Sequence, residues 1–447
     1  MKRHLKPSLL LSSIIACSMG FNAQAEQSIT PEWLKISGES RLRFEHLDEQ
    51  FRVGTDGSDQ GLFLRTLLKA DADLGKVNLV GELIDARELF DIADEGSPLS
   101  TSTNNPLDVL QLYAKVDLFA DTDKNIESYV RVGRFTMDIG TRRFVSRNGT
   151  RNTINSYNGI DWHYNNSKLA FRAFYTNPVQ RRIDGDPLDN DPKTDQAFDE
   201  VDFWGVYLSP KTTKINNEWY VFDLKEDDDI NQATNNRDLT TVGTHWWTKA
   251  KTSEWYYDAE FTYQWGDTRS SSSSTTDLDQ QAYFAHLETG YSFDAKYSPK
   301  ISFVYDYASG DEDPNDLDSE RFDTLFGSRR FDYGPTAVFG PFIRSNISTP
   351  GVKLNLKPTS QTKVLVGLRG FWLAEETDAF SGARIPASAD NSDTYIGTQL
   401  EARWQWTSIS KKIKVDLTGA YLNAGDVLEN NDKNDSTFVY AAVTYVF

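Results

Sequence analysis

The sequence predicts an all-β transmembrane antiparallel barrel of about 18 strands, with 16 strands as the competing count. Three observations carry this prediction. The composition is polar but rich in aromatic residues, apolar and polar residues alternate with a period of two, and short connections alternate with long ones. Such barrels show all three because each strand turns one face to lipid and the other to a wet lumen, with short periplasmic turns and long extracellular loops.

The composition excludes several other classes of protein. The chain has 447 residues, of which 25 % are charged and 13 % aromatic, and its mean hydropathy is −0.55. After the N-terminus, no apolar run approaches the roughly 20 residues that a membrane-spanning helix needs. The net charge of −19 argues against a nucleic-acid binder held by phosphate contacts. The single Cys excludes a disulfide framework and a Cys-based zinc site.

The first 25 residues have the features of a secretory signal peptide. A basic start precedes a mostly apolar stretch from Leu9 to Phe21, and Ala23-Gln24-Ala25 provides a small-residue cleavage site. A lipoprotein cleavage box that would keep Cys17 as the acylated N-terminus is the alternative. With either site the chain is exported, and we expect residues 26–447 to form a single barrel domain in the outer membrane.

The alternation is clearest between Trp255 and Trp265, where apolar residues, most of them aromatic, occupy every second position. This pattern is typical of a strand between lipid and lumen, with aromatic rings near the membrane interfaces. The last ten residues alternate in the same way and end on Phe447. An aromatic final residue resembles the signal by which the barrel-assembly machinery recognises its substrates, so we expect that machinery to be a partner.

The connections give the strand number. Short turns occur near Gly75, Asn166, Pro210, Ser253, Ala295, Pro358 and Ser408. Nine long polar loops lie near 47–60, 89–107, 138–156, 179–198, 226–238, 267–280, 310–345, 375–392 and 424–436. One strand on each side of nine loops gives eighteen strands, an even number that places both termini in the periplasm.

Several stretches of the chain contain short motifs that are best considered together. They are Val132 to Phe135 with Gly140 to Val145, Tyr157 to Asp161, Ala308 to Asp311 with Phe322 to Phe326, Pro350 to Pro358, and Phe371 to Ala379. They occur in order along most of the chain, and together they resemble the alginate-export family of outer-membrane porins. The resemblance implies an eighteen-stranded barrel with an Arg-rich passage for an anionic polysaccharide, although the wider family includes porins that are not tied to alginate.

The alternation also assigns basic residues to the lumen. In the first strand Leu42 and Phe44 face lipid, so Arg41 and Arg43 face inward. Similar logic gives the basic pore-lining set, to which the resemblance adds Arg134: Lys35, Arg41, Arg43, Arg65, Lys69, Lys115, Arg131, Arg134, Arg172, Arg369 and Arg403. Rings of basic residues favour anions, and Arg can bind a uronate carboxylate in a bidentate manner.

Acidic residues on the same face leave a structural alternative. The predicted inward acids are Glu39, Asp71, Glu82, Asp85, Asp258 and Glu260. They could pair with the basic residues and stabilise the wall instead of leaving those residues free for a substrate. For any single Arg, both interpretations stay open.

The loop at 138–156 holds four Arg residues within ten positions, among them Arg142 and Arg143. If the loop folds inward, these residues would form a cationic constriction. If it points outward, they would bind lipopolysaccharide phosphates or remain solvated. Other long loops are acidic, for example Glu226 to Asp229 and Asp311 to Asp318. A solvated acidic rim is the simpler interpretation of these loops; a Ca²⁺ site is the alternative, and we expect no other cofactor.

The sequence thus favours a passive outer-membrane channel for an anionic oligo- or polysaccharide, most simply alginate or another polyuronate. A general or small-solute porin is the alternative. The histidines occur in no recognisable catalytic motif, so we expect no enzymatic activity. The expected partners are outer-membrane lipid, lipopolysaccharide and the anionic saccharide, without nucleic acid, and we expect a monomer.

Overall fold

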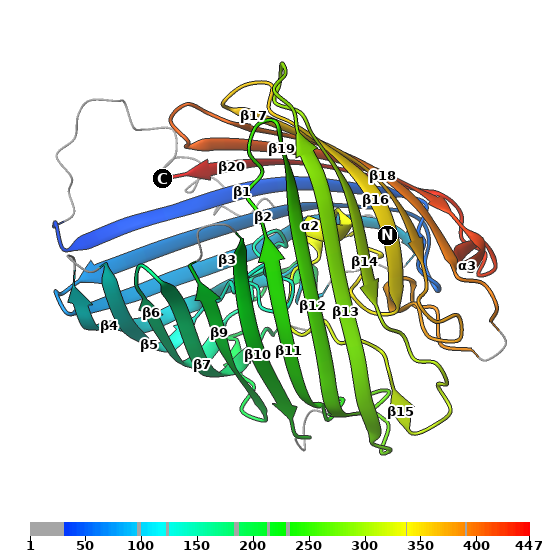
Figure 1. Ribbon diagram of the computed structural model, residues 1–447, viewed down its shortest axis with the longest axis horizontal. Helices are drawn as coiled ribbons and strands as arrows, with labels where there is room; N and C mark the ends of the chain where they lie inside the picture. The colour runs from blue at the N-terminus through cyan, green and yellow to red at the C-terminus, as the bar shows by residue number, and fades with distance from the viewer. Residues whose placement is uncertain are drawn as a thin grey trace.

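A computed structural model describes residues 31–95, 100–121, 125–182, 187–211, 215–228, 233–336, 338–388 and 391–447. The predicted signal peptide and the alternative site at Cys17 lie outside these residues. The chain forms a barrel whose long, tilted strands run between two ends of different character (Figure 1). At one end the connections are short; at the other, most of them are long.

Eighteen strands form one closed antiparallel ring, in which each strand pairs with its neighbours along the chain and β20 pairs with β1. In chain order they are β1 (Leu34–Asp48), β2 (Asp56–Asp73), β3 (Val77–Glu95), β4 (Asn105–Asp121), β5 (Ile126–Phe135), β6 (Tyr157–Asn165), β7 (Leu169–Gln180), β9 (Val201–Pro210), β10 (Asn216–Glu226), β11 (Asp238–Trp247), β12 (Glu254–Thr268), β13 (Leu278–Ser292), β14 (Lys300–Ala308), β16 (Ile347–Leu356), β17 (Thr362–Trp372), β18 (Tyr395–Thr407), β19 (Ile413–Ala424) and β20 (Ser436–Val446). The prediction of eighteen strands is therefore confirmed, and sixteen is wrong.

Short elements occupy the long loops. They are the strands β8 (Gln196–Ala197) and β15 (Asp318–Ser319), the helices α2 (Arg330–Tyr333) and α3 (Asp426–Glu429), and the 3₁₀ turns at Pro187–Asp189 and Ser381–Ala383. None of the helices among the described residues is long and apolar enough to cross a membrane.

The seam of the barrel joins the two ends of the chain. β1 and β20 pair from Glu39–Val446 to Asp48–Thr437, and the backbones of Gly38 and Phe447 exchange two hydrogen bonds of 3.0 Å. Closing the sheet leaves no unpaired strand edge in the lipid, where an unsatisfied backbone group would cost several kcal/mol.

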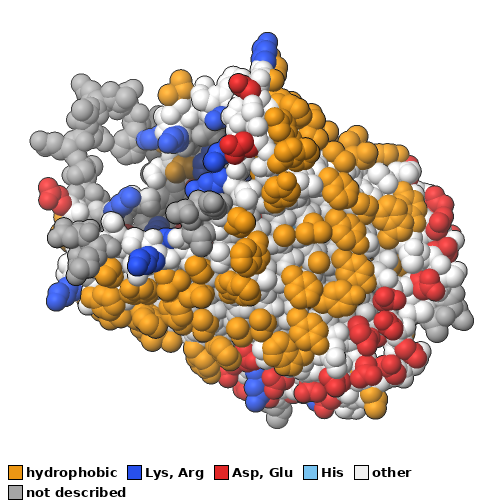
Figure 2. Space-filling view, viewed as in Figure 1, with side chains coloured by type: hydrophobic (Ala, Val, Ile, Leu, Met, Phe, Trp, Pro, Cys, Tyr) orange, Lys and Arg blue, Asp and Glu red, His pale blue; other side chains and the backbone are white. Residues whose placement is uncertain are grey.

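The outer surface carries the apolar face of every strand. On β12, Trp255, Tyr257 and Phe261 are 59 %, 55 % and 53 % exposed, whereas Glu260 between them is buried. Figure 2 shows hydrophobic side chains covering the surface between the two ends of the barrel. Exposed aromatic and aliphatic residues of this kind are stable only against lipid, so this face defines the membrane-embedded band.

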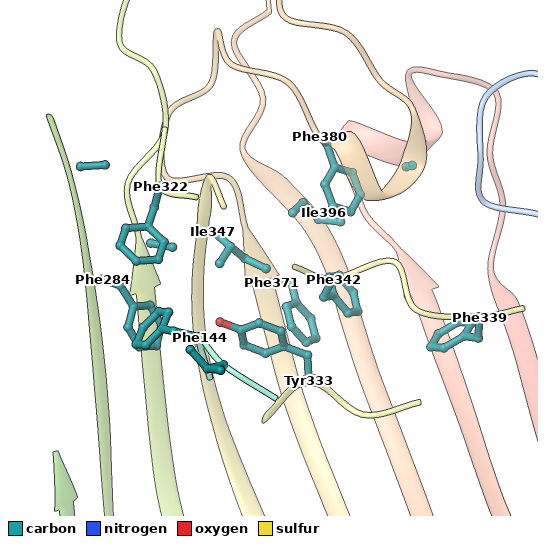
Figure 3. Packing of buried hydrophobic residues seen from close by; sticks show 14 of the residues in the cluster. Phe144, Phe284, Phe322, Tyr333, Phe339, Phe342, Ile347, Phe371, Phe380 and Ile396 are labelled. Carbon is teal, nitrogen blue, oxygen red and sulfur yellow. The ribbon is translucent and has the colours of Figure 1, made fainter. Parts of the chain in front are cut away.

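The lumen is filled at its long-loop end. Phe144, from the loop between β5 and β6, contacts Phe284 of β13 and Phe322 of the loop after β14, with ring centroids 5.8 Å apart in both cases. Phe342 of that same loop stacks on Phe371 of β17 (Figure 3). These aromatic contacts pack two loops inside the barrel against its wall.

Candidate functional site

Two loops enter the lumen and contact each other there. We call residues 136–156 the third loop and residues 309–346 the seventh loop. The amide of Phe326 donates to the carbonyl of Phe144 at 2.9 Å, and the amide of Ser146 donates to the carbonyl of Phe326 at 3.2 Å. The third loop therefore folds inward, which answers the question that its sequence left open.

Arginines of β1 and β2 hold the tip of the third loop. Arg41 donates to the carbonyl of Arg151 at 2.7 Å, and Arg65 donates to the carbonyls of Gly149 and Arg151 at 2.8 and 2.9 Å. Arg43 donates to the carbonyl of Thr150 at 2.7 Å. These three predicted pore residues therefore lie in the lumen, where they position loop backbone.

A second set of contacts fixes the middle of the third loop. Arg143 donates to Glu260 of β12 at 2.6 Å and to Asp332 of the seventh loop at 3.1 Å, and Arg147 donates to Glu82 of β3 at 3.1 Å. Burial lowers the pKa of Arg143, but the carboxylates of Asp332 and Glu260 outweigh it, and the net pKa lies well above its usual value. Arg143 therefore stays charged.

Arg142, the neighbouring residue, behaves differently. Its guanidinium lies 4.1 Å from the ring centroid of Phe331, and it forms no ion pair with any described residue. Its backbone has a φ of 67°, in the left-handed region. The two adjacent arginines thus have different partners, and of these two only Arg143 anchors the loop through ion pairs.

Other predicted basic residues pair with carboxylates of the wall. Arg131 and Arg172 both donate to the buried Asp161, at 2.9 and 2.8 Å. Three further pairs have the same character: Arg369 with Asp306, Arg403 with Asp416, and Lys115 with Asp117. For these five residues the wall-stabilising interpretation describes the observed contacts.

The predicted residues nearest the short-turn end also face one another. Lys35 of β1 stands opposite Asp71 of β2, and Lys69 of β2 stands opposite Glu82 of β3. Glu39 accepts a hydrogen bond from Arg65 at 2.7 Å. Basic and acidic residues therefore alternate along this part of the wall.

The predicted acids on β12 belong to a polar network with histidines. Asp258 lies 3.0 Å from the Nε2 atom of His245 and 3.5 Å from that of His286. Glu260 accepts a hydrogen bond from the hydroxyl of Tyr220 at 2.6 Å in addition to the one from Arg143. These contacts place both acids in the wall beside the inserted loops.

Two predicted residues do not face the lumen. Arg134 stands opposite Leu112 and on the same face as Val132, which are 64 % and 51 % exposed to the outside. Asp85 shares the outer face of β3 with Arg87, and the two pair at 2.7 Å. Both assignments are therefore wrong.

Their polar groups are tolerated on the outer face because each has partners near the long-loop end. Arg134 donates to Asn158 and to the carbonyl of Val109, both at 3.0 Å. Asp85 also accepts the amide of Leu107 at 3.2 Å. Satisfied polar groups close to the edge of the membrane cost far less than bare charges at its centre.

A cluster of arginines in the loops at the long-loop end of the barrel was largely missed by sequence reasoning. We call it the outer arginine cluster, and it consists of Arg52, Arg151, Arg181, Arg329 and Arg384. Of these residues, only Arg151 lies in a loop whose sequence is rich in Arg. The others lie in separate loops, so alternation along a strand gives no signal for them.

The electrostatics of this cluster are unusual. Burial and the charges of Arg181 and Arg329 lower the pKa of Arg151 to about 9, and burial with Arg329 and Arg384 lowers that of Arg52 to about 10. None of the five forms an ion pair with a described residue. The cluster is therefore a region of positive potential without bound carboxylates.

Cavities lie on both sides of the inserted loops. At the short-turn end, one cavity of about 420 Å³ is lined by Arg41, Arg43 and Arg403, and a second of about 460 Å³ also includes Arg403. At the long-loop end, a cavity of about 490 Å³ is lined by Arg237 and Arg321, among others. Basic side chains therefore border the lumen on both sides of the constriction.

Comparison with known proteins agrees with this architecture. The sequence model of the alginate export family matches residues 32–442, nearly the whole chain. No match was found among the curated proteins.

Solved structures with the same fold include outer-membrane porins of Pseudomonas aeruginosa. OccK3 (OpdO) has a TM-score of 0.59 at 12 % identity, with 93 % of this chain and 95 % of that chain covered. OccK8 (OprE) has a TM-score of 0.60 at 10 % identity, with 93 % and 98 % covered. OccK2 (OpdF), solved in complex with glucuronate, has a TM-score of 0.57 at 12 % identity, with 93 % and 98 % covered.

The similarity to these structures identifies the fold, and the family match covers the strands and both inserted loops. The short-turn end of the barrel is therefore periplasmic and the long-loop end extracellular. The protein is an outer-membrane β-barrel channel and belongs to the alginate export family.

Proposed function

We propose that this channel passes an anionic oligo- or polysaccharide, and that the saccharide is alginate or another polyuronate. The observation that carries the proposal is the outer arginine cluster, because the charges of its members lower the pKa of Arg52 and of Arg151, and none of the five has an ion-pair partner among the described residues. A polyuronate offers one carboxylate on every sugar and would supply the missing partners.

The contrast with the wall supports this assignment. Arg131, Arg172 and Arg369 each have a buried carboxylate of the protein, so an anionic chain would have to compete with it. Arg329, in contrast, donates no hydrogen bond from its guanidinium to any described residue. Guanidinium groups bind carboxylates through two parallel hydrogen bonds, so an unpaired one is a ready subsite for a uronate.

One structural neighbour offers further support. OccK2 (OpdF) was solved with glucuronate, a uronic acid, although it is only 12 % identical to this chain. We infer that the present barrel takes the same class of sugar in polymeric form. The channel is passive in this proposal, because the wall and the inserted loops supply binding groups and no source of energy.

Single-channel recording tests the proposal. We expect anion selectivity, and block by an oligomannuronate but not by a neutral malto-oligosaccharide. Exchanging Arg151 and Arg329 for Gln should weaken the block about tenfold or more, since a hydrogen bond to a charged group contributes roughly 1.5–3 kcal/mol. The matched control is Asp85→Asn with Arg87→Gln, which removes an ion pair from the outer face and should leave the block unchanged.

The results also separate the alternative function. Cation selectivity without sugar block would contradict the proposal and favour a general porin. If the oligomannuronate blocks the variant with Arg151→Gln and Arg329→Gln as strongly as the wild-type protein, the outer arginine cluster does not bind the saccharide.

A further inference from the structure

The periplasmic turns share a feature that the lumen does not explain. Six of the connections at this end are described in full, at 74–76, 166–168, 248–253, 293–299, 357–361 and 408–412. Each of them holds at least one exposed lysine: Lys76, Lys168, Lys249, Lys296, Lys357 and Lys412. We call these six residues the lysine collar.

The charge of these turns is one-sided. Together the six turns contain eight Lys, no Arg and a single carboxylate, Asp294. The nine extracellular loops have the opposite balance, with 30 Asp and Glu against 16 Lys and Arg. Figure 2 shows Lys and Arg around the hollow at the end where the C-terminus lies, and Asp and Glu at the other end.

The collar lysines are free to act on something outside the protein. None of the six forms an ion pair with a described residue. Lys296 lies 4.8 Å from the ring centroid of Tyr297, its own neighbour, and this contact leaves the ammonium group in solvent. The fold of these turns does not require lysine, because the residues that favour tight turns are Gly, Pro, Asn, Asp and Ser.

The positive surface continues from the rim into the lumen. The cavity of about 460 Å³ is lined by Lys300, Lys357 and Lys363, and the cavity of about 420 Å³ by Lys363, Lys414 and Arg41. Lys357 therefore belongs both to the collar and to a lumenal cavity. A lipid headgroup of the inner leaflet could reach the outside of the rim, but it could not line these cavities.

We propose that the lysine collar captures an anionic polymer from the periplasm and delivers its end to the basic cavities above it. This inference rests on the proposed function and adds a polarity to it: the chain is collected at the periplasmic mouth, while the acidic extracellular rim repels it. Lysine suits capture because its ammonium is a strongly hydrated point charge, which attracts a polyanion without fixing it in a bidentate geometry.

The expected effect is kinetic. A mouth lined by one sign of charge raises the association rate of an oppositely charged ligand by about 10- to 1,000-fold, and salt removes this gain. At about 1 M salt the Debye length falls to about 3 Å, against about 10 Å at 0.1 M, so the collar would no longer act beyond direct contact.

The test is the rate of block measured from each side of a neutral phosphatidylcholine bilayer. The orientation is fixed by Ser272→Cys in an extracellular loop, biotinylated and bound by streptavidin in one chamber. The probe is a short oligomannuronate, and the comparison is the protein with all six collar lysines exchanged for Gln. The matched control exchanges the same six lysines for Arg, which keeps the charge.

We expect the association rate from the periplasmic side to exceed that from the extracellular side about tenfold at low salt, and the two rates to converge at high salt. The Gln variant should lose this difference and the Arg variant should keep it. If the Gln variant does not fold, the inference is tested by the wild-type protein alone, from the salt dependence of the difference between the two association rates.

Three outcomes would overturn the inference. Equal association rates of the oligomannuronate from both sides at low salt would show that the lysine collar does not capture it, and would leave the proposed function intact. A Gln variant that keeps its sidedness but inserts less well into bilayers with anionic phosphatidylglycerol would make the lysines a lipid contact. If the oligomannuronate blocks the channel from neither side, this would contradict the proposed function itself and the role of the lysine collar.

Discussion

Arg143 is predicted to be the residue that keeps the third loop inside the barrel. Its guanidinium lies 2.6 Å from Glu260 and 3.1 Å from Asp332, and all three side chains are at least nine-tenths buried. Replacing Arg143 with Met would leave the buried carboxylate of Glu260 without a counterion, whereas Asp332 would keep its ion pair with Arg344. Removing one partner of a buried ion pair costs about 3–5 kcal/mol, which changes the ratio of inserted to released loop by a factor of about 100 to 4,000.

The assay is single-channel conductance combined with limited proteolysis of the loop. We expect Arg143→Met to give a larger, noisier conductance and to expose the third loop to trypsin. Arg142→Gln is the matched control, because Arg142 lies on Phe331 and has no ion pair with any described residue. Adding Glu260→Gln to Arg143→Met should restore part of the loop occupancy; Asp332 is left unchanged because it also pairs with Arg344. Wild-type conductance and proteolysis in Arg143→Met would refute the reasoning.

Two further predictions concern stability and pH. Asp161→Asn should lower the free energy of unfolding by about 3 kcal/mol, because Arg131 and Arg172 would lose a buried counterion. The temperature at which heating shifts the band of the barrel in a gel measures this loss, and an unchanged temperature would contradict the prediction. Burial and the charge of Asp378 raise the pKa of Asp311 to about 6, so lowering the pH from about 7.5 to about 5 protonates it at the extracellular entrance and should increase anion selectivity. The reversal potential reports this change, and Asp311→Asn should reduce its pH dependence; the same pH dependence in that variant would speak against this role.

Most of the barrel could be predicted because its pattern is local. Each predicted long loop overlaps an observed one, and only the turn between β4 and β5 had no predicted counterpart. The strands are longer than the roughly ten residues expected from membrane thickness. β2 and β3 have 18 and 19 residues, because they extend beyond the lipid at the long-loop end.

The facing of side chains was predictable where alternation is regular and failed for Arg134 and Asp85. The alternation assigned Arg41 and Lys115 to the lumen correctly. Arg134 lies near the extracellular end of β5, and Asp85 lies in the middle of β3 beside Leu107 at the extracellular end of β4; both find polar partners on the outer face. A pattern of hydrophobicity cannot distinguish such a residue from one that lines the pore.

The site itself depends on contacts between residues far apart in the chain. Arg41 and Arg65 bind carbonyl oxygens of the third loop that lie 84 to 110 residues later. Backbone carbonyls leave no trace in the composition of a segment, so the sequence could not show that the loop folds inward. The outer arginine cluster was missed for the same reason, since it gathers single residues from separate loops.

The passage of a uronate chain is tested most directly by flux. Liposomes that hold the purified protein would be loaded with a fluorescent oligomannuronate or with a neutral malto-oligosaccharide of the same length. We predict that the uronate leaves the liposomes much faster than the neutral sugar, and that Arg151→Gln with Arg329→Gln narrows the difference. Equal release of the two sugars, or retention of both while small ions pass, would contradict a channel selective for polyuronates.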